Sequence, residues 1–319
     1  NTPQTVTVTG VDDNIIDGTI SSTITASIDD GNSDDAFDAV ADQTVTATTT
    51  DNDVAGFTIA QTGGSTSVAE TGTTDTFTVV LNAQPASNVV LTVTSNDTGE
   101  ATVNTPLTFT SANWNTAQTV TVTGVDDNII DGNINSTITI TIVDAISDND
   151  FDAVADQTVT ATTTDDDVAG FTVAQTDDST SVAETGTTDT FTIVLNAQPA
   201  SDVVLTVTSS DTGEATVNTP LTFTSGNWNT AQTVTVTGVD DNIIDGNINS
   251  TITIAVNDGS SDNDFDPVAD QTVTATTTDN DVAGFTVAQT GGSTAVAETG
   301  NTDTYTVVLH AQPASNVLL

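Results

Sequence analysis

A repeat of 114 residues constrains the fold of this chain more than any other feature. The segment TVTVTGVDDNIIDG begins at Thr5, Thr119 and Thr233. Residues 54–167 and 168–281 differ at 14 of 114 positions. A solenoid coil needs only about 20–50 residues, so a period of this length is typical of one independently folded β-sandwich per repeat.

The repeat also predicts the domain boundaries. We expect complete repeats at 54–167 and 168–281, with the C-terminal part of a repeat at 1–53 and the N-terminal part of one at 282–319. We interpret the chain as a section of a longer array. The alternative is that the two end pieces complement each other between subunits by strand donation.

Each repeat reads as an all-β domain. In TVTVT, polar and apolar residues alternate, which places the valines on one face of a strand and the threonines on the other. Seven such runs are separated by turn residues, so we predict tandem immunoglobulin-like antiparallel β-sandwiches of about seven strands. In the repeat 54–167 the expected strands are 56–61, 75–82, 88–95, 101–110 with a break at Pro106, 118–125, 136–143 and 157–164.

The charge of the chain is entirely one-sided. There is no Lys or Arg against 45 Asp and Glu, and the formal net charge is −45. Nucleic acids and anionic membrane surfaces are therefore excluded as partners, and cations are favoured. No Cys is present, so disulfides cannot stabilise an exported domain and a metal is the natural substitute. We expect an extracellular or cell-surface location, with no membrane insertion in this segment.

The acids gather at one end of the predicted sandwich. If successive strands reverse direction, the loops after the first, third and fifth strands lie beside the chain exit, at an end that we call the exit pole. Its acids in the repeat 54–167 are Glu70, Asp75, Asp97, Glu100, Asp126, Asp127, Asp131, Asp165, Asp166 and Asp167. Crowded oxygen ligands from loops, without His or Cys, favour calcium over zinc, copper or magnesium. A merely solvated acidic surface is the alternative.

A second acidic group lies on the loop 144–156, at the opposite pole. We interpret it as an inter-domain metal group facing the preceding exit pole, with a polar turn as the alternative. Its residues in the two repeats are Asp148, Asp150, Asp152, Asp262, Asp264 and Asp266.

The repeat resembles a Calx-β domain of the kind found in tandem in large bacterial surface proteins. The matching features are VAETG at 68–72, the strand TVTVTG followed by the acidic pair at 126–127, and DDD at 165–167 before the next AGF. The resemblance implies several calcium ions per repeat. The ligands that it implies are Glu70, Asp97, Asp126, Asp127, Asp165, Asp166 and Asp167, and then Glu184, Asp211, Asp240, Asp241, Asp279 and Asp281.

Two departures from the family pattern concern the same pole. Asp131 and Asp245 stand where the family has glutamates; we include both among the expected ligands. Asn280 replaces the carboxylate of Asp166. An EF-hand is excluded by spacing, since Ile130 occupies a position that needs an oxygen ligand.

The expected function is a non-catalytic extracellular structural or adhesive array, stiffened by calcium at the inter-domain poles. Its partners would be neighbouring repeats and cell-surface or matrix components. The alternatives are a self-assembling extracellular filament subunit and a carbohydrate- or ice-binding module. Aromatic residues make up 4% of the chain, too few to line a glycosidase cleft. His310 replaces Asn82 and Asn196 of the other repeats, which favours a surface substitution.

Overall fold

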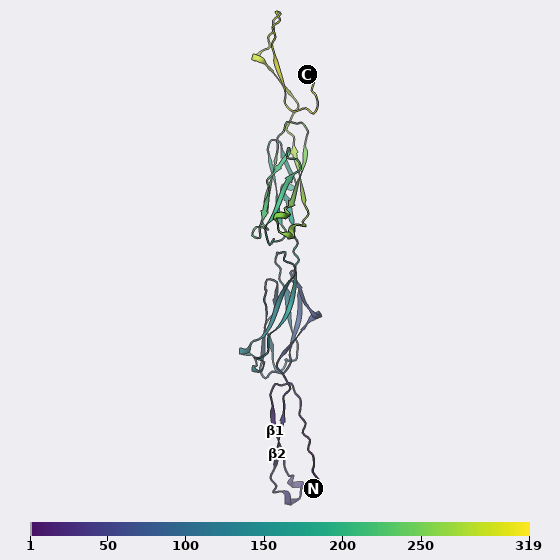
Figure 1. Ribbon diagram of the computed structural model, residues 1–319, viewed down its shortest axis with the longest axis vertical. Coiled ribbons are helices and arrows are strands. Elements are labelled where there is room, and N and C mark those ends of the chain that lie inside the picture. The colour runs from purple at the N-terminus through teal and green to yellow at the C-terminus, as the bar shows by residue number, and fades with distance from the viewer. Residues whose placement is uncertain (1) are drawn as a thin grey trace. The chain divides into compact units, whose positions relative to one another are not determined.

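A computed structural model describes residues 2–319 and contains strands, turns and short 3₁₀ helices, with no α-helix among those residues (Figure 1). The chain forms two compact units. Unit 1 comprises the residues up to Asp127 and Asp131–Asp166; unit 2 comprises Asn128–Ile130 and Asp167–Leu319. Each unit holds one complete sandwich and one partial repeat.

The complete sandwich of unit 1 has two sheets. The first is antiparallel, in the order β3 (Phe57–Gln61), β5 (Thr74–Leu81), β9 (Gln118–Gly124) and β7 (Ala101–Val103). The second has the order β4 (Thr66–Ala69), β11 (Gln157–Thr164), β10 (Ile134–Ile142), β6 (Val89–Ser95) and β8 (Leu107–Phe109). All neighbours in the second sheet are antiparallel except β4 and β11, which are parallel.

The sandwich of unit 2 has the same strand order in both sheets. The first sheet runs β12 (Phe171–Gln175), β14 (Thr188–Leu195), β18 (Gln232–Gly238) and β16 (Ala215–Val217). The second runs β13 (Thr180–Ala183), β20 (Gln271–Thr278), β19 (Ile248–Val256), β15 (Val203–Ser209) and β17 (Leu221–Phe223).

The partial repeats form two-stranded sheets. They are β1 (Ile20–Ala26) with β2 (Gln43–Thr49) in unit 1, and β21 (Phe285–Gln289) with β22 (Tyr305–Leu309) in unit 2. The 3₁₀ helices are Asp30–Asn32, Asp35–Phe37, Thr62–Gly64, Asp144–Ile146, Asn149–Phe151, Thr176–Asp178, Asp258–Ser260, Asn263–Phe265 and Thr290–Gly292.

Alternation along the strands builds the core. In β9, Val120 and Val122 are fully buried between the sheets, whereas the threonines of the same strand face outward. Phe77, Phe109 and Phe151 are also fully buried and belong to the same cluster. Each fully buried side chain of this size stabilises the fold by about 1.5–3 kcal/mol relative to exposure. Partly buried Trp114 packs against this core rather than forming a separate aromatic surface.

The all-β sandwich prediction is confirmed, with two differences in detail. We predicted no strand at Thr66–Ala69, whereas the structure has β4 there. The expected strand 101–110 is two short strands in different sheets, because the chain crosses from one sheet to the other at Pro106, where a backbone N–H is missing.

Candidate metal centre

The parallel pair of β4 and β11 brings two acids together at the exit pole of unit 1. Ala69 lies opposite Thr164 in the register, so Glu70 and Asp165 leave the sheet side by side. The backbone N–H of Glu70 donates to the carbonyl of Thr164 at 3.1 Å and continues the ladder by one step. The short strand that the sequence did not reveal is therefore the element that places Glu70.

A second pairing adds Glu100. Ala101, the first residue of β7, lies opposite Gly124, and the N–H of Val125 donates to the carbonyl of Glu100 at 2.8 Å. Gly124 is required here because a Cβ atom at this position would lie 2.1 Å from the carbonyl oxygen of Ala69. The glycine that ends TVTVTG thus lets β9 approach the backbone beside Glu70.

Glu70, Glu100 and Asp131 form the inner cluster of this pole. One carboxylate oxygen from each lies within 4.8 Å of the other two. Glu70 is 1% exposed and Glu100 6%. Neither Glu70 Oε2 nor Glu100 Oε2 has a hydrogen-bond partner among the described residues. The cluster therefore holds buried oxygens whose interactions within the protein are incomplete.

The electrostatics of the cluster follow from burial and crowding. Burial, and then the charge of Asp165, raise the pKa of Glu70 from 4.5 to about 7. Burial also raises the pKa of Glu100 and of Asp131, and in both cases neighbouring carboxylates add to the effect. Without a bound cation, Glu70 is therefore partly protonated near neutral pH, where an ordinary carboxylate is ionised.

Unit 2 contains the same cluster and a second one that shares a residue with it. Glu184, Glu214 and Asp245 form the first group, and Glu184, Asp279 and Asp281 form the second, each with oxygens within 4.8 Å of one another. Glu184 is common to both and is 1% exposed. Burial raises the pKa of Glu184, Glu214 and Asp281, whereas backbone N–H groups, chiefly that of Gly246, lower the pKa of Asp279.

Other expected ligands are bound by backbone groups of the same pole. Asp97 and Asp211 lie outside the clusters and cap their own turns, accepting from the N–H of Gly99 and Gly213 at 3.0 Å. Asp241 accepts the N–H of Ile243 at 2.7 Å. In unit 1, Asp165 accepts the N–H of Gly132 at 2.8 Å.

The remaining expected ligands lie on the same loops. Asp126 and Asp127 follow β9 in unit 1, and Asp127 contributes to the raised pKa of Glu70. Asp166 follows Asp165 and its backbone N–H lowers the pKa of Glu70, whereas Asp167 is the first residue of the last segment of unit 2. Asp240 accepts a hydrogen bond from the side chain of Asn280 at 3.0 Å.

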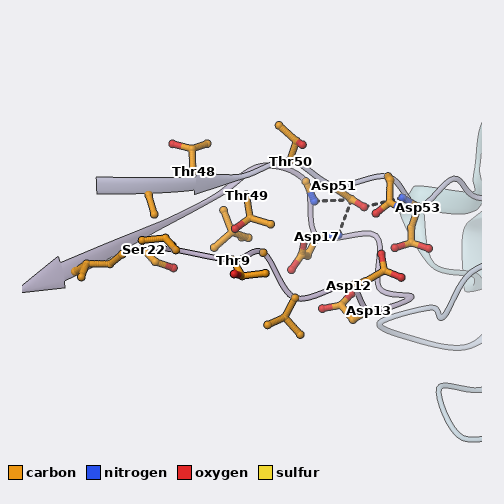
Figure 2. Close-up of a pocket in the computed structure, with 18 residues that line it drawn as sticks. Thr9, Asp12, Asp13, Asp17, Ser22, Thr48, Thr49, Thr50, Asp51 and Asp53 are labelled. Atoms are coloured by element: carbon orange, nitrogen blue, oxygen red, sulfur yellow. Dashed lines mark hydrogen bonds between the residues drawn. The ribbon is translucent and has the colours of Figure 1, made fainter. Parts of the chain in front are cut away.

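The partial repeat of unit 1 shows the arrangement of the loops without the glutamates. Figure 2 shows the carboxylates of Asp12, Asp13, Asp17, Asp51 and Asp53 gathered at one end of this repeat. Asp51 accepts from the N–H groups of Asp17, Gly18 and Asp53 at 3.1, 2.8 and 2.8 Å. The aspartate loops therefore take this form through backbone hydrogen bonds.

The acidic loop at the opposite pole is organised within its own repeat. Asp148 is 5% exposed and accepts from Ser87 N at 2.6 Å, Ser87 Oγ at 3.3 Å and Asp150 N at 3.2 Å. Burial raises its pKa, but these hydrogen bonds outweigh burial and the net shift is downward. Asp262 has the same contacts with Ser201 and Asp264.

An inter-domain metal role for this loop therefore stays a prediction. Within the described part of the chain, Asp148, Asp150 and Asp152 form no group of converging ligand atoms, and neither do Asp262, Asp264 and Asp266. The hydrogen bonds of Asp148 and Asp262 give these two carboxylates a different role, which is to hold the loop that contains Ser87 or Ser201.

Glu100 and Glu214 are the cluster members that the expected ligand set left out. The chain contains five glutamates, and the two complete repeats hold four of them, at Glu70, Glu100, Glu184 and Glu214. All other acids are aspartates, so the longer side chain is confined to two positions of the repeat. That restriction was a usable signal, because both positions, the one after β4 or β13 and the one before β7 or β16, supply the inner clusters.

The donor set fits a hard cation. The clusters consist of carboxylate oxygens only, and ligands about 2.4 Å from a calcium ion lie within about 5 Å of one another. The chain has no Lys or Arg that could neutralise the buried glutamates. An unpaired buried carboxylate costs several kcal/mol, so a cation supplied from solution would satisfy the unpartnered oxygens.

No protein-family model and no curated protein sequence matches the chain. Among solved structures, CBD12 from CALX1.2 is 12% identical over 68% of this chain and 99% of its own length, with a TM-score of 0.28. The calcium-binding domain CBD12 of CALX1.1 is 13% identical over 62% of this chain and 80% of its own, with a TM-score of 0.27. The interpretation of the clusters depends on their own geometry, because the TM-scores are low.

The surface-layer protein SbsC, in its domains 4 and 5, is also similar to this chain. It is 20% identical over 59% of this chain and 76% of its own length, with a TM-score of 0.28. No helix of the described residues has the length and apolar character needed to cross a membrane.

Proposed function

We propose that the chain is a calcium-binding section of a non-catalytic, extracellular or cell-surface array of β-sandwich repeats. One observation carries the proposal: buried glutamates with unpartnered oxygens converge at the exit pole of a chain that has no cationic side chain except a single His. Calcium supplies the missing positive charge. The array is built for position and stiffness rather than for chemistry.

Each cluster residue has a distinct part in this proposal. Glu70 and Glu184 are the most buried ligands of their poles, and Glu184 joins the two groups of unit 2. Glu100 and Glu214 supply the second carboxylate of each inner cluster. Asp131 and Asp245 supply the third, from the loop that follows β9 or β18. Asp279 and Asp281 supply the outer group. Mixed carboxylates from flexible loops suit calcium better than the stricter octahedron of magnesium.

The proposal is tested by thermal unfolding of the full chain in excess chelator and in millimolar calcium, with calorimetric titration of the metal. Binding to the folded state alone stabilises it by about 2.7 kcal/mol per site at a hundredfold excess over Kd. We therefore expect a rise of several degrees in Tm with calcium and a smaller one with magnesium. An unchanged Tm, or no calcium heat, contradicts the proposal.

A matched pair of variants localises the ions. Glu184→Gln should lower the calcium stoichiometry, because Glu184 belongs to both groups of unit 2. Glu298→Gln makes the same change at the equivalent position of the last partial repeat, where the glutamate is exposed and outside any cluster of the described residues. It should leave the stoichiometry at the parent value.

A further inference from the structure

The loop that follows TVTVTG at the exit pole contains an apolar segment. Between its aspartates each repeat has Asn-Ile-Ile, at 14–16, 128–130 and 242–244. An exposed loop in so acidic a chain gains nothing from two adjacent isoleucines unless they are covered. In two of the three repeats the second isoleucine, Ile16 or Ile130, packs against a hydrophobic core.

In unit 1 this segment is bonded to the next repeat in the chain. The carbonyl of Asn14 accepts the N–H of Gln84 at 2.7 Å, and Ile15 and Gln84 form a parallel β-bridge. Ile16 packs against the hydrophobic core of the sandwich that contains Gln84. One backbone hydrogen bond and one apolar contact therefore join residues 70 positions apart.

Unit 2 repeats both contacts. Gln198 donates to the carbonyl of Asn128 at 2.6 Å, and Ile130 packs against the core of the same unit. Gln312 in turn donates to the carbonyl of Asn242. Ile244 is 46% exposed and packs against no described core cluster, because residues 282–319 form only part of a sandwich.

The receiving loop comprises residues 82–88, and its equivalents are 196–202 and 310–316. In the repeat 54–167, contacts within the same repeat hold this loop in place. The Nε2 of Gln84 donates to the carbonyl of Ser111 at 3.0 Å, and the N–H of Ser87 donates to the buried carboxylate of Asp148. The loop therefore presents a fixed N–H group at Gln84. This gives Asp148 a role in shaping the receiving surface.

Carboxylates of the exit pole hold the Asn-Ile-Ile segment in place. Asp13 accepts the N–H of Ile15 at 2.9 Å, and Asp51 accepts the N–H groups of Asp17 and Gly18 just after the segment. Asp241 and Asp279 make the equivalent bonds around Asn242–Ile244. The shape of the segment is thus set by side chains at the pole where the cation is proposed to bind.

We infer that Asn-Ile-Ile is the docking element of each repeat and that the Gln-Pro loop of the following repeat is its receiving surface. The partner is another repeat of the same chain, recognised by a backbone hydrogen bond and one partly buried isoleucine. A further step rests on the proposed function: because pole carboxylates shape the segment, calcium binding strengthens docking.

The test is hydrogen–deuterium exchange of the full chain, read by mass spectrometry at the three receiving loops. Their peptides are distinguishable because Asn88, Asp202 and His310 differ between the loops. Ile16→Asn should raise the exchange rate of the loop containing Gln84 by about tenfold, the effect of losing about one hydrogen bond. Ile130→Asn should do the same at Gln198, and Ile16→Val should retain protection.

Ile244→Asn is the matched control, since the same substitution there removes no core contact and should leave the other two loops unchanged. Exchange within β5 checks that the receiving sandwich stays folded. Unchanged exchange at Gln84 in Ile16→Asn and at Gln198 in Ile130→Asn overturns the docking inference, whatever the calcium result.

Chelation separates the two steps. If the chain binds calcium, the exchange rates at Gln84 and Gln198 in the parent should rise on chelation. If these rates do not change with calcium but do rise at Gln84 in Ile16→Asn, the coupling to calcium is overturned and the docking inference stands. If calorimetry shows no calcium binding, the proposed function fails and so does the coupling. The isoleucine variants still decide docking in that case.

Discussion

The side-chain amide of Asn280 donates a hydrogen bond to Oδ1 of Asp240 at 3.0 Å, while its backbone N–H donates to Oε2 of Glu184 at the same distance. The equivalent residue of the preceding repeat is Asp166, which has no side-chain N–H to donate. The two complete repeats thus differ at this position of the pole. In unit 2 the Asn280 side chain donates a hydrogen bond to the carboxylate of Asp240, whereas in unit 1 the equivalent Asp166 adds a negative charge to the pole.

Asn280→Asp should therefore have opposite effects with and without metal. The variant loses one hydrogen bond and gains a charge beside Asp240, so the metal-free Tm should fall by about 2–4 °C, the shift expected for about 1 kcal/mol. An additional carboxylate should raise calcium affinity about fivefold to tenfold. Differential scanning calorimetry and calorimetric titration measure the two effects.

The reciprocal change, Asp166→Asn, is the control for this pair. It should raise the metal-free Tm and weaken calcium binding. If both variants shift Tm in the same direction, the pole is not governed by charge crowding.

The metal-free chain should lose stability as the pH rises from about 4.5 to 7. Glu70 has a folded-state pKa of about 7 against an ordinary value of 4.5. In this window the folded state binds more protons than the unfolded state, so the free energy of unfolding falls with pH. The loss is on the order of 3 kcal/mol at about 1.4 kcal/mol per pKa unit. Denaturant unfolding at several pH values, in chelator, measures it.

Two controls identify the groups behind this profile. Glu70→Gln should flatten the decrease between pH 4.5 and 7, and calcium should reduce it by stabilising the ionised carboxylate. The lowered pKa of Asp148 acts in the opposite direction: its contribution is present above its ordinary value of 3.8 and is lost as the pH falls below that. A metal-free chain whose stability rises steadily up to pH 7 would be inconsistent with buried, protonated glutamates.

Asp148→Asn should destabilise the complete repeat of unit 1 by about 1–3 kcal/mol. The carboxylate accepts three hydrogen bonds, from Ser87 N, Ser87 Oγ and Asp150 N, and an amide has only one accepting oxygen. Denaturant unfolding measures the loss. Asp150→Asn is the control on the same loop, at an exposed side chain, and should change stability by less than about 0.5 kcal/mol. Equal effects of the two variants would contradict a specific role for Asp148.

Gly238→Ala should cost about 2–4 kcal/mol and weaken calcium binding at the same pole. A Cβ atom at Gly238 would lie 2.1 Å from the carbonyl oxygen of Ala183, the residue before Glu184, so the backbone must move. Gly226→Ala is the matched control, because its nearest atom is 3.8 Å away and the preceding repeat has Ala112 at this position. A stable Gly238→Ala variant with intact calcium binding would rule out a tight approach of these strands.

The strands in which polar and apolar residues alternate could be predicted from the sequence, because their apolar positions are the ones that the sandwich buries. The predicted strand at 157–164 agrees with β11, and that at 118–125 with β9 to within one residue. β4 was missed because it has only four residues and its first inward position is Thr66, a buried polar side chain that breaks the apolar signal. The sheet change at Pro106 depends on tertiary pairing, which local pattern does not contain.

The pole could be predicted as a region, but its inner members could not. Acidic loops mark the exit pole because strand direction alone gathers them. Which carboxylates meet depends on register: Glu100 is beside Val125 only because Ala101 pairs with Gly124. Asp97 looked equivalent in the sequence, yet its side chain turns back to the N–H of Gly99.

The parallel pairing of β4 with β11 determines how a complete repeat would carry tension. The chain enters the sandwich through β3, continues into β4 and leaves directly after β11, so once β3 has detached from β5, pulling on the two ends drags β4 and β11 in opposite directions along their length. Four residue pairs, from Thr66 with Ala161 to Ala69 with Thr164, then resist together instead of opening one at a time. A fibre made of such repeats would yield to load by shear of β4 against β11, beside Glu70, where the cation is proposed to bind.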